Sequence, residues 1–371
     1  MTVSINRRNL LGASITAGLA AAAPAAFAHP AAKMPAKWDE TFDVVVIGSG
    51  FAGLSAAIEA KTAGANVVVF DQMPIPGGNS ILSAGGFAAP ENDMQKKAGI
   101  QDSPELLLKD MLRAGGNLNQ VQCAKVVAYR WATDFIGVKW DRLGFQGGHS
   151  VARSCSFKNG TGADIIGPML DKCKELGIPV RLRTKMTNIV TDDKGAVLGV
   201  EILKNFRFPN QKSGKPAAVR ALRGVVLGGG GFSQNIKMRM MQDPRLTSEL
   251  GSTNQPGADG AALQAAERIG AGTTLMDWIQ LGPWTSPDEV GFGECPKFVE
   301  ASVGYGLMVD PQTGKRFVQE TGNRKVRADA IIATGHPSII MISEKNMKKH
   351  VPQSTVDAGV KNGSIKRLEG L

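Results

Sequence analysis

The chain has 371 residues, with 43 Lys or Arg against 33 Asp or Glu, so its formal net charge is +10. It has only two Tyr and five Trp, and no basic run is interleaved with aromatic residues, which argues against a nucleic-acid groove. Cys123, Cys155, Cys173 and Cys295 form no CxxC or CxxCH pattern, so we expect no metal site, thioredoxin-like pair or covalently attached haem. Whether these cysteines form disulfides or stay buried thiols is left open by the sequence.

Residues 1–28 have the features of an export signal. Arg7 and Arg8 precede an apolar stretch, and residues 26–28 read Ala-Phe-Ala, a cleavage-site pattern. The arginine pair indicates the twin-arginine route and a periplasmic location, with an ordinary secretory signal or an uncleaved anchor as alternatives. Cleavage would remove these two arginines and no acid, lowering the net charge from +10 to +8. Residues 29–40 read as a linker, and beyond the signal no run of about 18 apolar residues predicts a membrane span.

Residues 43–71, DVVVIGSGFAGLSAAIEAKTAGANVVVFD, predict a strand, a glycine turn, a helix and a second strand that ends in an acid. Gly48 permits the tight turn, Gly50 permits a pyrophosphate to approach the backbone, and Gly53 permits close packing of helix on strand. The helix N-terminus favours phosphate binding. Asp71 is placed to accept hydrogen bonds from a ribose diol. The segment therefore predicts a dinucleotide-binding site.

Two small-residue clusters follow, at 76–80 and 83–86, and both are too glycine-rich for a helix interior and suited to backbone contact with a flat ligand. The glycines at 228–231 suggest another close approach to a cofactor. From about residue 243 the sequence changes to mixed loops with short helix-like and strand-like segments, which indicates a second domain. The expected elements are helices over 104–143, capped by Ser103, over 165–176, ended by Gly177, and over 261–269, with strands over 179–190, 195–203, 223–227, 306–309 and 339–342.

The order of motifs carries a family resemblance. GSGFAG, GGNS, SAGG, GGHSVARS, VVLGGGGF, TNQPGADG and GKRFVQETGNR occur in one order between residues 41 and about 345. They resemble the flavoprotein subunits of the fumarate reductase and succinate dehydrogenase superfamily, most closely the flavocytochrome c type. The resemblance implies an α/β fold with a Rossmann-like FAD-binding domain, expected at 41–242, and an inserted α+β capping domain, expected in part at 243–371. The family's closing HGANRLGGN-like segment is absent, so we expect a truncated C-terminus, an open sheet edge and weak flavin retention.

The resemblance also implies which residues bind FAD. Gly48, Gly50, Gly53 and Ala52 would form the pyrophosphate turn, and Asp71 would meet the adenosine ribose. The other implied contacts are Asn79, Ser80, Gly85 and Gly86 along the pyrophosphate and isoalloxazine, and Met186, whose backbone would meet the adenine.

Family chemistry is hydride transfer from flavin N5 to an activated C=C bond, with a proton delivered by an arginine. Arg324 stands at the catalytic arginine of the resembled motif, and Glu300 at its relay glutamate. Val303, Val299 and Gly282 replace polar residues that the family uses for the relay or for a dicarboxylate. The expected substrate is therefore a bulkier or less charged enoate than fumarate. The expected partners are this small unsaturated carboxylate and a separate electron donor such as a c-type cytochrome.

Two other functions stay open at this point. One is a truncated, non-catalytic relative or one part of a split enzyme that binds at most the ADP part of FAD. The other is an NAD(P)H dehydrogenase with two nucleotide folds, which is disfavoured because no second GxGxxG unit is present.

Overall fold

The computed structural model describes residues 34–119, 121, 129–145, 148–157, 161–282, 304–320, 322 and 324–362. The chain divides into two compact units, one of residues 1–231 and 260–273 and the other of residues 232–259 and 274–371. The predicted signal at 1–28 lies outside the described residues. Among the helices of the described residues, none combines the length and apolar character needed to cross a membrane.

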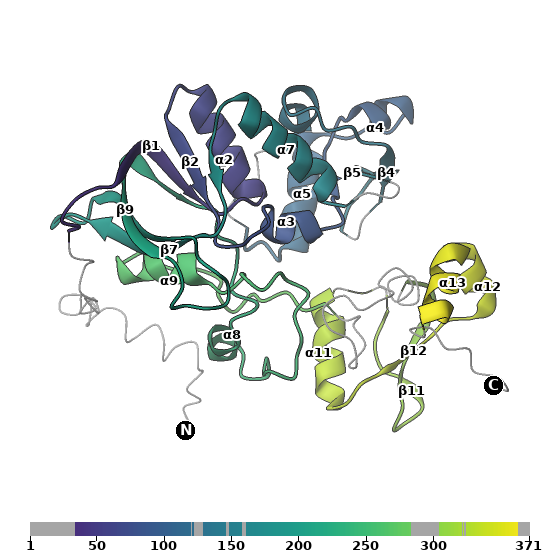
Figure 1. The fold of residues 1–371 in the computed structure, drawn as a ribbon. Helices are drawn as coiled ribbons and strands as arrows, with labels where there is room; N and C mark the ends of the chain where they lie inside the picture. Colours follow the sequence, from purple (N-terminus) through teal and green to yellow (C-terminus); the bar gives the residue numbers. More distant parts are fainter. Residues whose placement is uncertain are drawn as a thin grey trace, which may run out of the picture. The chain divides into compact units, whose positions relative to one another are not determined.

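The first unit is built on a six-stranded sheet of order β6-β2-β1-β9-β8-β7 (Figure 1). Its strands are β1 (Glu40–Ile47), β2 (Val67–Phe70), β6 (Val180–Arg181), β7 (Thr184–Thr191), β8 (Val197–Lys204) and β9 (Lys215–Leu227). β1 pairs in parallel with β2 and β9, β2 pairs in parallel with β6, and β8 runs antiparallel to β7 and β9. Helix α2 (Phe51–Thr62) connects β1 to β2, so the sequence-predicted strand–helix–strand unit is present.

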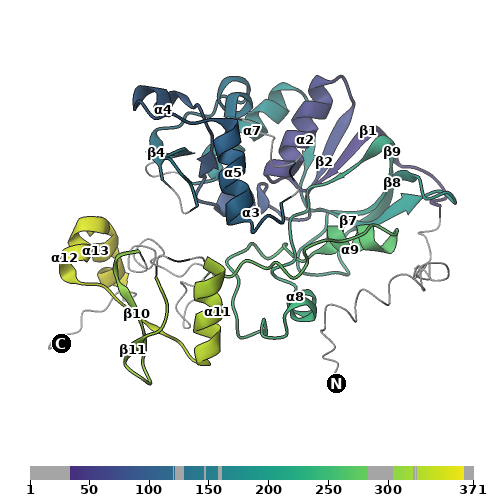
Figure 2. The same ribbon diagram turned by 180° about the vertical axis from the view of Figure 1, so that it is seen from behind.

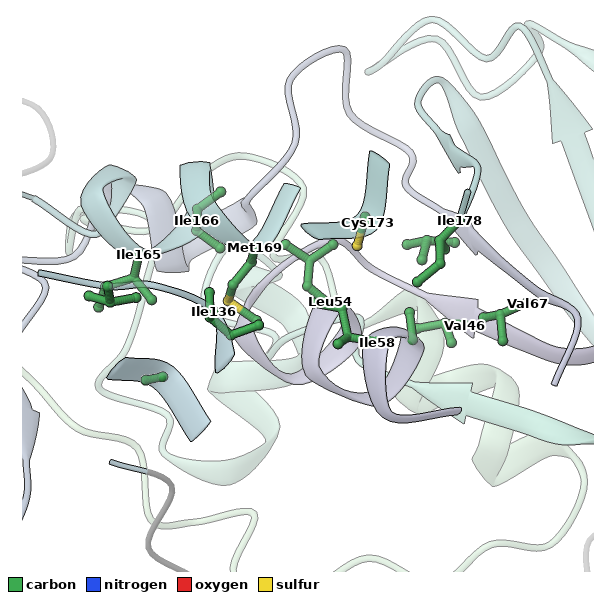
Figure 3. Packing of buried hydrophobic residues seen from close by; sticks show 14 of the residues in the cluster. Val46, Leu54, Ile58, Val67, Ile136, Ile165, Ile166, Met169, Cys173 and Ile178 are labelled. Carbon is green, nitrogen blue, oxygen red and sulfur yellow. The ribbon is translucent and has the colours of Figure 1, made fainter. Parts of the chain in front are cut away.

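Both faces of this sheet are apolar, as expected for parallel strands that are covered on each side. Val46, Val67 and Val69 face a cluster with Leu54 and Ile58 of α2 and with Ile166 and Met169 of α7 (Ala163–Glu175), which Figure 3 shows from close by. The alternating neighbours Val45, Ile47, Val68 and Phe70 pack in a second cluster with Met186 of β7 and Ala265 of α9 (Ala261–Arg268). The alternation thus fixes the strand register, because a one-residue slip would exchange the two clusters.

The far half of β9 has an open edge. β9 pairs with β8 only through residues 215–220, whereas its pairing with β1 continues to Leu227. In the part of the chain that the structure describes, Ala221 and residues 224–227 therefore pair with β1 alone. Leu222 lies at the register shift between them and is 57% exposed. Among the described residues, this part of β9 is therefore an edge of the sheet. The truncation expected from the sequence stays a prediction.

The rest of the first unit lies between β2 and β6 in sequence. A three-stranded antiparallel sheet has the order β3-β5-β4. Ser103 caps α5, because its Oγ accepts the Leu106 N–H at 3.1 Å. These elements are α3 (Gly78–Leu82), β3 (Phe87–Ala88), α4 (Asp93–Lys97), α5 (Pro104–Ala114), a π-helix (Trp131–Phe135), β4 (Arg142–Gly144) and β5 (Ser154–Ser156).

A buried ionic network holds this region together. The side chain of Arg153 is fully buried and donates from Nε and Nη2 to Asp102 at 2.8 and 2.7 Å, and from Nη1 to Asp110 at 2.6 Å. Gln95 Nε2 also donates to Asp102, and the Ser150 hydroxyl donates to Asp110 at 2.6 Å. Burial opposes the charge on Arg153, but its hydrogen bonds to the two aspartates outweigh this and raise the pKa of the guanidinium. None of these contacts was foreseen from the sequence.

The second unit contains a small antiparallel sheet of order β11-β10-β12. Figure 2 shows strands β10 and β11 of this sheet and the helices α8, α11, α12 and α13. Glu320 is buried, and its carboxylate accepts the Met308 N–H at 2.9 Å and the Arg316 guanidinium at 2.6 Å. Arg239, also buried, donates to backbone carbonyls that include Ser233 at 3.1 Å and Leu246 at 3.0 Å. The elements are α8 (Ile236–Gln242), β10 (Leu307–Asp310), β11 (Lys315–Arg316), α11 (Arg324–Thr334), β12 (Ile339–Met341), α12 (Glu344–His350) and α13 (Gln353–Asn362).

Some sequence-based element predictions were wrong in detail. The described part of 104–143 contains α5, a π-helix and the strand β4, so it is not helical throughout. The cluster at 76–80, predicted to be non-helical, contains the start of α3, because the left-handed Gly77 (φ +103°) begins the helix. Helix α9, expected in the second domain, belongs to the first unit, where Ala265 packs in the second cluster. The assignment of the two domain roles to 41–242 and 243–371 stays a prediction.

The two described cysteines are free thiols. Cys155 and Cys173 are both buried. Burial raises the pKa of Cys155 to about 12 and that of Cys173 to about 11. Neither thiol therefore offers a thiolate nucleophile near neutral pH. Cys123 and Cys295 lie outside the described residues.

Candidate cofactor-binding site

The turn between β1 and α2 is closed by backbone packed on backbone. Gly48 has φ +97°, and a Cβ built on it would lie 2.2 Å from the Gly228 carbonyl oxygen. A Cβ on Gly53 would lie 1.8 Å from the Gly48 carbonyl oxygen. Side chains are therefore excluded where β1, α2 and the end of β9 meet, which confirms the close packing expected of Gly53. Gly228 takes part in the same packing, because a Cβ on it would lie 2.9 Å from the Gly53 backbone. The approach of residues 228–231 to a cofactor stays a prediction.

Asp71 is held by the turn. It is 7% exposed at the end of β2, and its Oδ2 accepts both the Ser49 N–H at 2.9 Å and the Ser49 hydroxyl at 2.6 Å. Its Oδ1 accepts the Met73 N–H at 2.8 Å. The Ser49 hydroxyl in turn accepts the Gly77 N–H at 3.0 Å. The acid at the end of the second strand is thus tied to the first glycine turn and to the loop after β2. Sequence reasoning missed Ser49, whose only signal was its position between Gly48 and Gly50.

The N-terminus of α2 lies against the second glycine cluster. Ser80 Oγ accepts the Phe51 N–H at 3.0 Å, and a Cβ on Gly50 would lie 3.0 Å from that Oγ. A side chain at position 50 would therefore crowd Ser80, and the approach of a pyrophosphate to Gly50 stays a prediction. Ala52, at the second position of the helix, is exposed. The first turn of an α-helix carries N–H groups without intrahelical acceptors and the positive end of the helix dipole, so this corner favours an anion.

The SAGG cluster lies beside the loop that precedes α7. The Gly162 N–H donates to the Ser83 carbonyl at 2.7 Å, and a Cβ on Gly85 (φ +67°) would lie 2.8 Å from the Thr161 carbonyl oxygen. Gly86 is exposed, and its Cβ position is 3.5 Å from Ser154 Oγ. Gly85 is thus required by packing, whereas Gly86 offers exposed backbone.

The beginning of β7 lies beside Asp71. The Thr184 N–H donates to the Asp71 carbonyl oxygen at 2.8 Å. Met186 lies two residues after Thr184 in the same strand, and is therefore near Asp71, the residue predicted to bind the ribose. The Met186 side chain is buried in the second cluster, so only its backbone is suited to a ligand. Gly48, Gly50, Gly53, Asp71, Ser80 and Met186 therefore come from one region of the first unit, together with Asn79, which lies in α3 next to Ser80.

The predicted catalytic residues belong to the other unit. Arg324 is the exposed first residue of α11, and Arg327, one turn further on, is buried and donates to the Glu320 carbonyl at 2.8 Å. Glu300, Val299 and Val303 lie outside the described residues. No cluster of potential metal ligands occurs among the residues that the structure describes.

The first-unit residues fit an FAD. The turn excludes side chains at Gly48 and Gly53, the α2 N-terminus can receive a pyrophosphate, and the Asp71 carboxylate is buried at the strand end where an adenosine ribose would bind. These groups together would hold the ADP half of the cofactor.

Comparisons with known proteins agree with this geometry. The family described as FAD binding domain matches residues 43–347. The acrylate reductase flavoprotein subunit of Shewanella woodyi is 41% identical over 360 residues, which are 93% of this chain and 71% of that protein. The fumarate reductase (cytochrome) of Shewanella frigidimarina is 34% identical over 349 residues, 89% of this chain and 58% of that protein. The open conformation of a flavocytochrome c3 fumarate reductase superposes with a TM-score of 0.74 at 29% identity, covering 87% of this chain and 56% of that structure.

The chain thus spans between about half and 71% of the length of these relatives. The first unit's parallel sheet, its glycine turn and these similarities all agree with the resemblance noted in the motifs. The chain belongs to the FAD-binding family of flavoproteins that includes the fumarate and acrylate reductase flavoprotein subunits.

Proposed function

We propose that the protein is an FAD-dependent reductase that saturates the activated C=C bond of a small enoate. The observation that carries the proposal is the 41% identity to an acrylate reductase flavoprotein subunit, over 93% of this chain. The assembled Gly48–Asp71 cradle supports the cofactor part of the proposal. When bound, FAD supplies the hydride.

The residues of the first unit would bind and orient the cofactor. Asp71 would accept a hydrogen bond from the adenosine ribose, and the first turn of α2 with Ser80 would hold the pyrophosphate. Gly86 and Asn79 would lie along the pyrophosphate and the isoalloxazine, and the Met186 backbone would meet the adenine. Contacts to the ADP end of FAD would thus help to position the isoalloxazine ring, although they lie far from the reacting atoms.

Arg324 would deliver the proton to the second carbon, with Glu300 as the group that returns a proton to it. The support is the position of Arg324 at the end of the GKRFVQETGNR motif. The motif is held in place by Glu320, whose buried carboxylate binds Arg316 and the Met308 N–H. A guanidinium at this point would also stabilise negative charge that develops on the enoate.

A less charged substrate than fumarate fits the sequence departures. Gly282, Val299 and Val303 offer no side-chain hydrogen-bond donor where the resembled motifs carry polar groups. A second carboxylate without donors would lose its hydrogen bonds on entering the site, which is costly. A monocarboxylate such as acrylate is therefore the proposed substrate class. We propose further that the Arg7–Arg8 signal directs the protein to the periplasm and that a separate c-type cytochrome supplies the electrons.

The test is reduction of acrylate and of fumarate by the flavin-loaded chain with reduced methyl viologen as electron donor. We expect acrylate to be consumed faster, and Arg324→Ala to abolish turnover while bound flavin per chain stays unchanged. Lys325→Ala is the matched control, because Lys325 is exposed on the same helix turn and pairs with Asp329. A flavin-loaded chain that reduces no enoate, or an Arg324→Ala variant with full activity, would contradict the proposal.

A further inference from the structure

We infer that Ser49 positions the Asp71 carboxylate so that a single acceptor position is left for the cofactor, and that the site therefore recognises one hydroxyl of the adenosine ribose and not both. The inference deepens the proposed function, because it rests on FAD binding in the first unit.

The acceptor positions of Asp71 can be counted. An ionised carboxylate offers about four lone-pair positions, two on each oxygen. On Oδ2, both are taken by Ser49, one by its N–H at 2.9 Å and one by its hydroxyl at 2.6 Å. On Oδ1, one is taken by the Met73 N–H at 2.8 Å. As far as the described part of the chain supplies donors, one position on Oδ1 remains.

Ser49 cannot easily release its share. Its side chain is fully buried, its hydroxyl also accepts the Gly77 N–H at 3.0 Å, and its backbone lies in the turn between Gly48 and Gly50. Rotation of the Ser49 hydroxyl would leave the Gly77 N–H or the Asp71 carboxylate without its partner in a buried place, which is unfavourable. The serine therefore fixes the rotamer of Asp71 and the direction of its free acceptor position.

A fixed single acceptor has a measurable consequence. Two neighbouring hydroxyls of a ribose can both donate to one carboxylate only if it has two free acceptor positions. With Oδ2 saturated, one hydroxyl donates to Oδ1 and the other must bond elsewhere or to water. Removal of the hydroxyl that donates to Asp71 should weaken FAD binding, whereas removal of the other hydroxyl should have little effect.

The experiment measures FAD affinity by quenching of flavin fluorescence on titration into the flavin-free full chain. Two analogues of FAD, with hydrogen in place of the 2′- or the 3′-hydroxyl of the adenosine, are compared with FAD itself. We expect one analogue to bind roughly 10- to 100-fold more weakly, the loss typical of a hydrogen bond to a charged group, and the other to remain within about threefold of FAD. Equal losses for the two analogues, no loss for either, or no binding of FAD would overturn the inference.

A variant pair assigns the effect to Ser49. In Ser49→Ala, Oδ2 gains a free acceptor position, so the difference in affinity between the two analogues should shrink to within about threefold. Ser55→Ala, in the first half of α2, is the matched control and should keep the full difference. An unchanged difference in Ser49→Ala would overturn the positioning role. The analogue comparison on the unaltered chain decides the question even if Ser49→Ala does not fold, and no enoate is present in the assay, so failure of the reductase proposal gives a different result.

Discussion

Replacement of Arg153 by methionine should destabilise the first unit severely. The Arg153 guanidinium makes hydrogen bonds of 2.6–2.8 Å to Asp102 and Asp110, and side-chain exposure is 0%, 0% and 2% for the three residues. Methionine approximates the volume of the stem but leaves two carboxylates facing one another in a buried site. The loss is therefore electrostatic in origin, with little contribution from packing.

The expected magnitude follows from the burial. Breaking a buried ion pair by removing one partner costs about 3–5 kcal/mol. Since each 1.4 kcal/mol is a factor of ten, the folded-to-unfolded ratio should fall by roughly two to nearly four orders of magnitude. For a typical domain with about 5–15 kcal/mol of stability, this change removes a large part of the total.

Urea denaturation followed by tryptophan fluorescence measures the change, since Trp140 packs against Phe87 and Phe157 in the same unit. Arg130→Met is the matched control: Arg130 also makes two hydrogen bonds to an aspartate, Asp93, but both side chains are about half exposed. The control should lose no more than about 1 kcal/mol. Equal losses of stability in the two variants would show that burial of the ion pair does not set its contribution.

Three further predictions use other parts of the molecule. Gly53→Ala should prevent FAD binding and lower the free energy of unfolding by at least about 1–3 kcal/mol, because the new Cβ would lie 1.8 Å from the Gly48 carbonyl oxygen. The control Gly167→Ala, which has open space around the new Cβ, should bind FAD normally in the same flavin-fluorescence titration. Burial opposes ionisation of Asp110, but bonds from serine and arginine lower its pKa from 3.8 to about 2, so its stabilising effect is complete above pH 3.8 and is lost as the pH falls toward 2. The stability difference between wild type and Asp110→Asn should accordingly shrink between pH 7 and pH 2.5, and a constant difference in urea midpoint would contradict this. Glu320→Gln should cost only about 1 kcal/mol in thermal unfolding, since the arginine of its ion pair is 55% exposed, and a loss above 3 kcal/mol would show that the pair matters more than its exposure indicates.

The sequence alone determined the features that depend on neighbours in the chain. The strand–glycine–helix–strand unit follows from the apolar runs around Gly48 to Gly53, and the cap at Ser103 follows from its position before a helical period. The glycine spacing is a local steric requirement, so it can be read without the fold. The element types of α7, β8 and β10 were also predicted correctly, because the periodicity of their apolar residues is a local property of the chain.

The tertiary structure decided which distant residues meet. The Ser49–Asp71 pair, the bond of Ser80 to the α2 N-terminus and the bonds of Arg153 to its two aspartates join residues 22 to 51 positions apart. No local pattern encodes such pairs. The placement of α9 was also missed, because α9 packs against the first unit's sheet although it follows the change in sequence pattern at residue 243. Sequence therefore identified the cradle, whereas only the fold showed that the Asp71 carboxylate is already largely occupied, since hydrogen-bond saturation depends on every group that surrounds an atom and not on the residue's own neighbours in the chain.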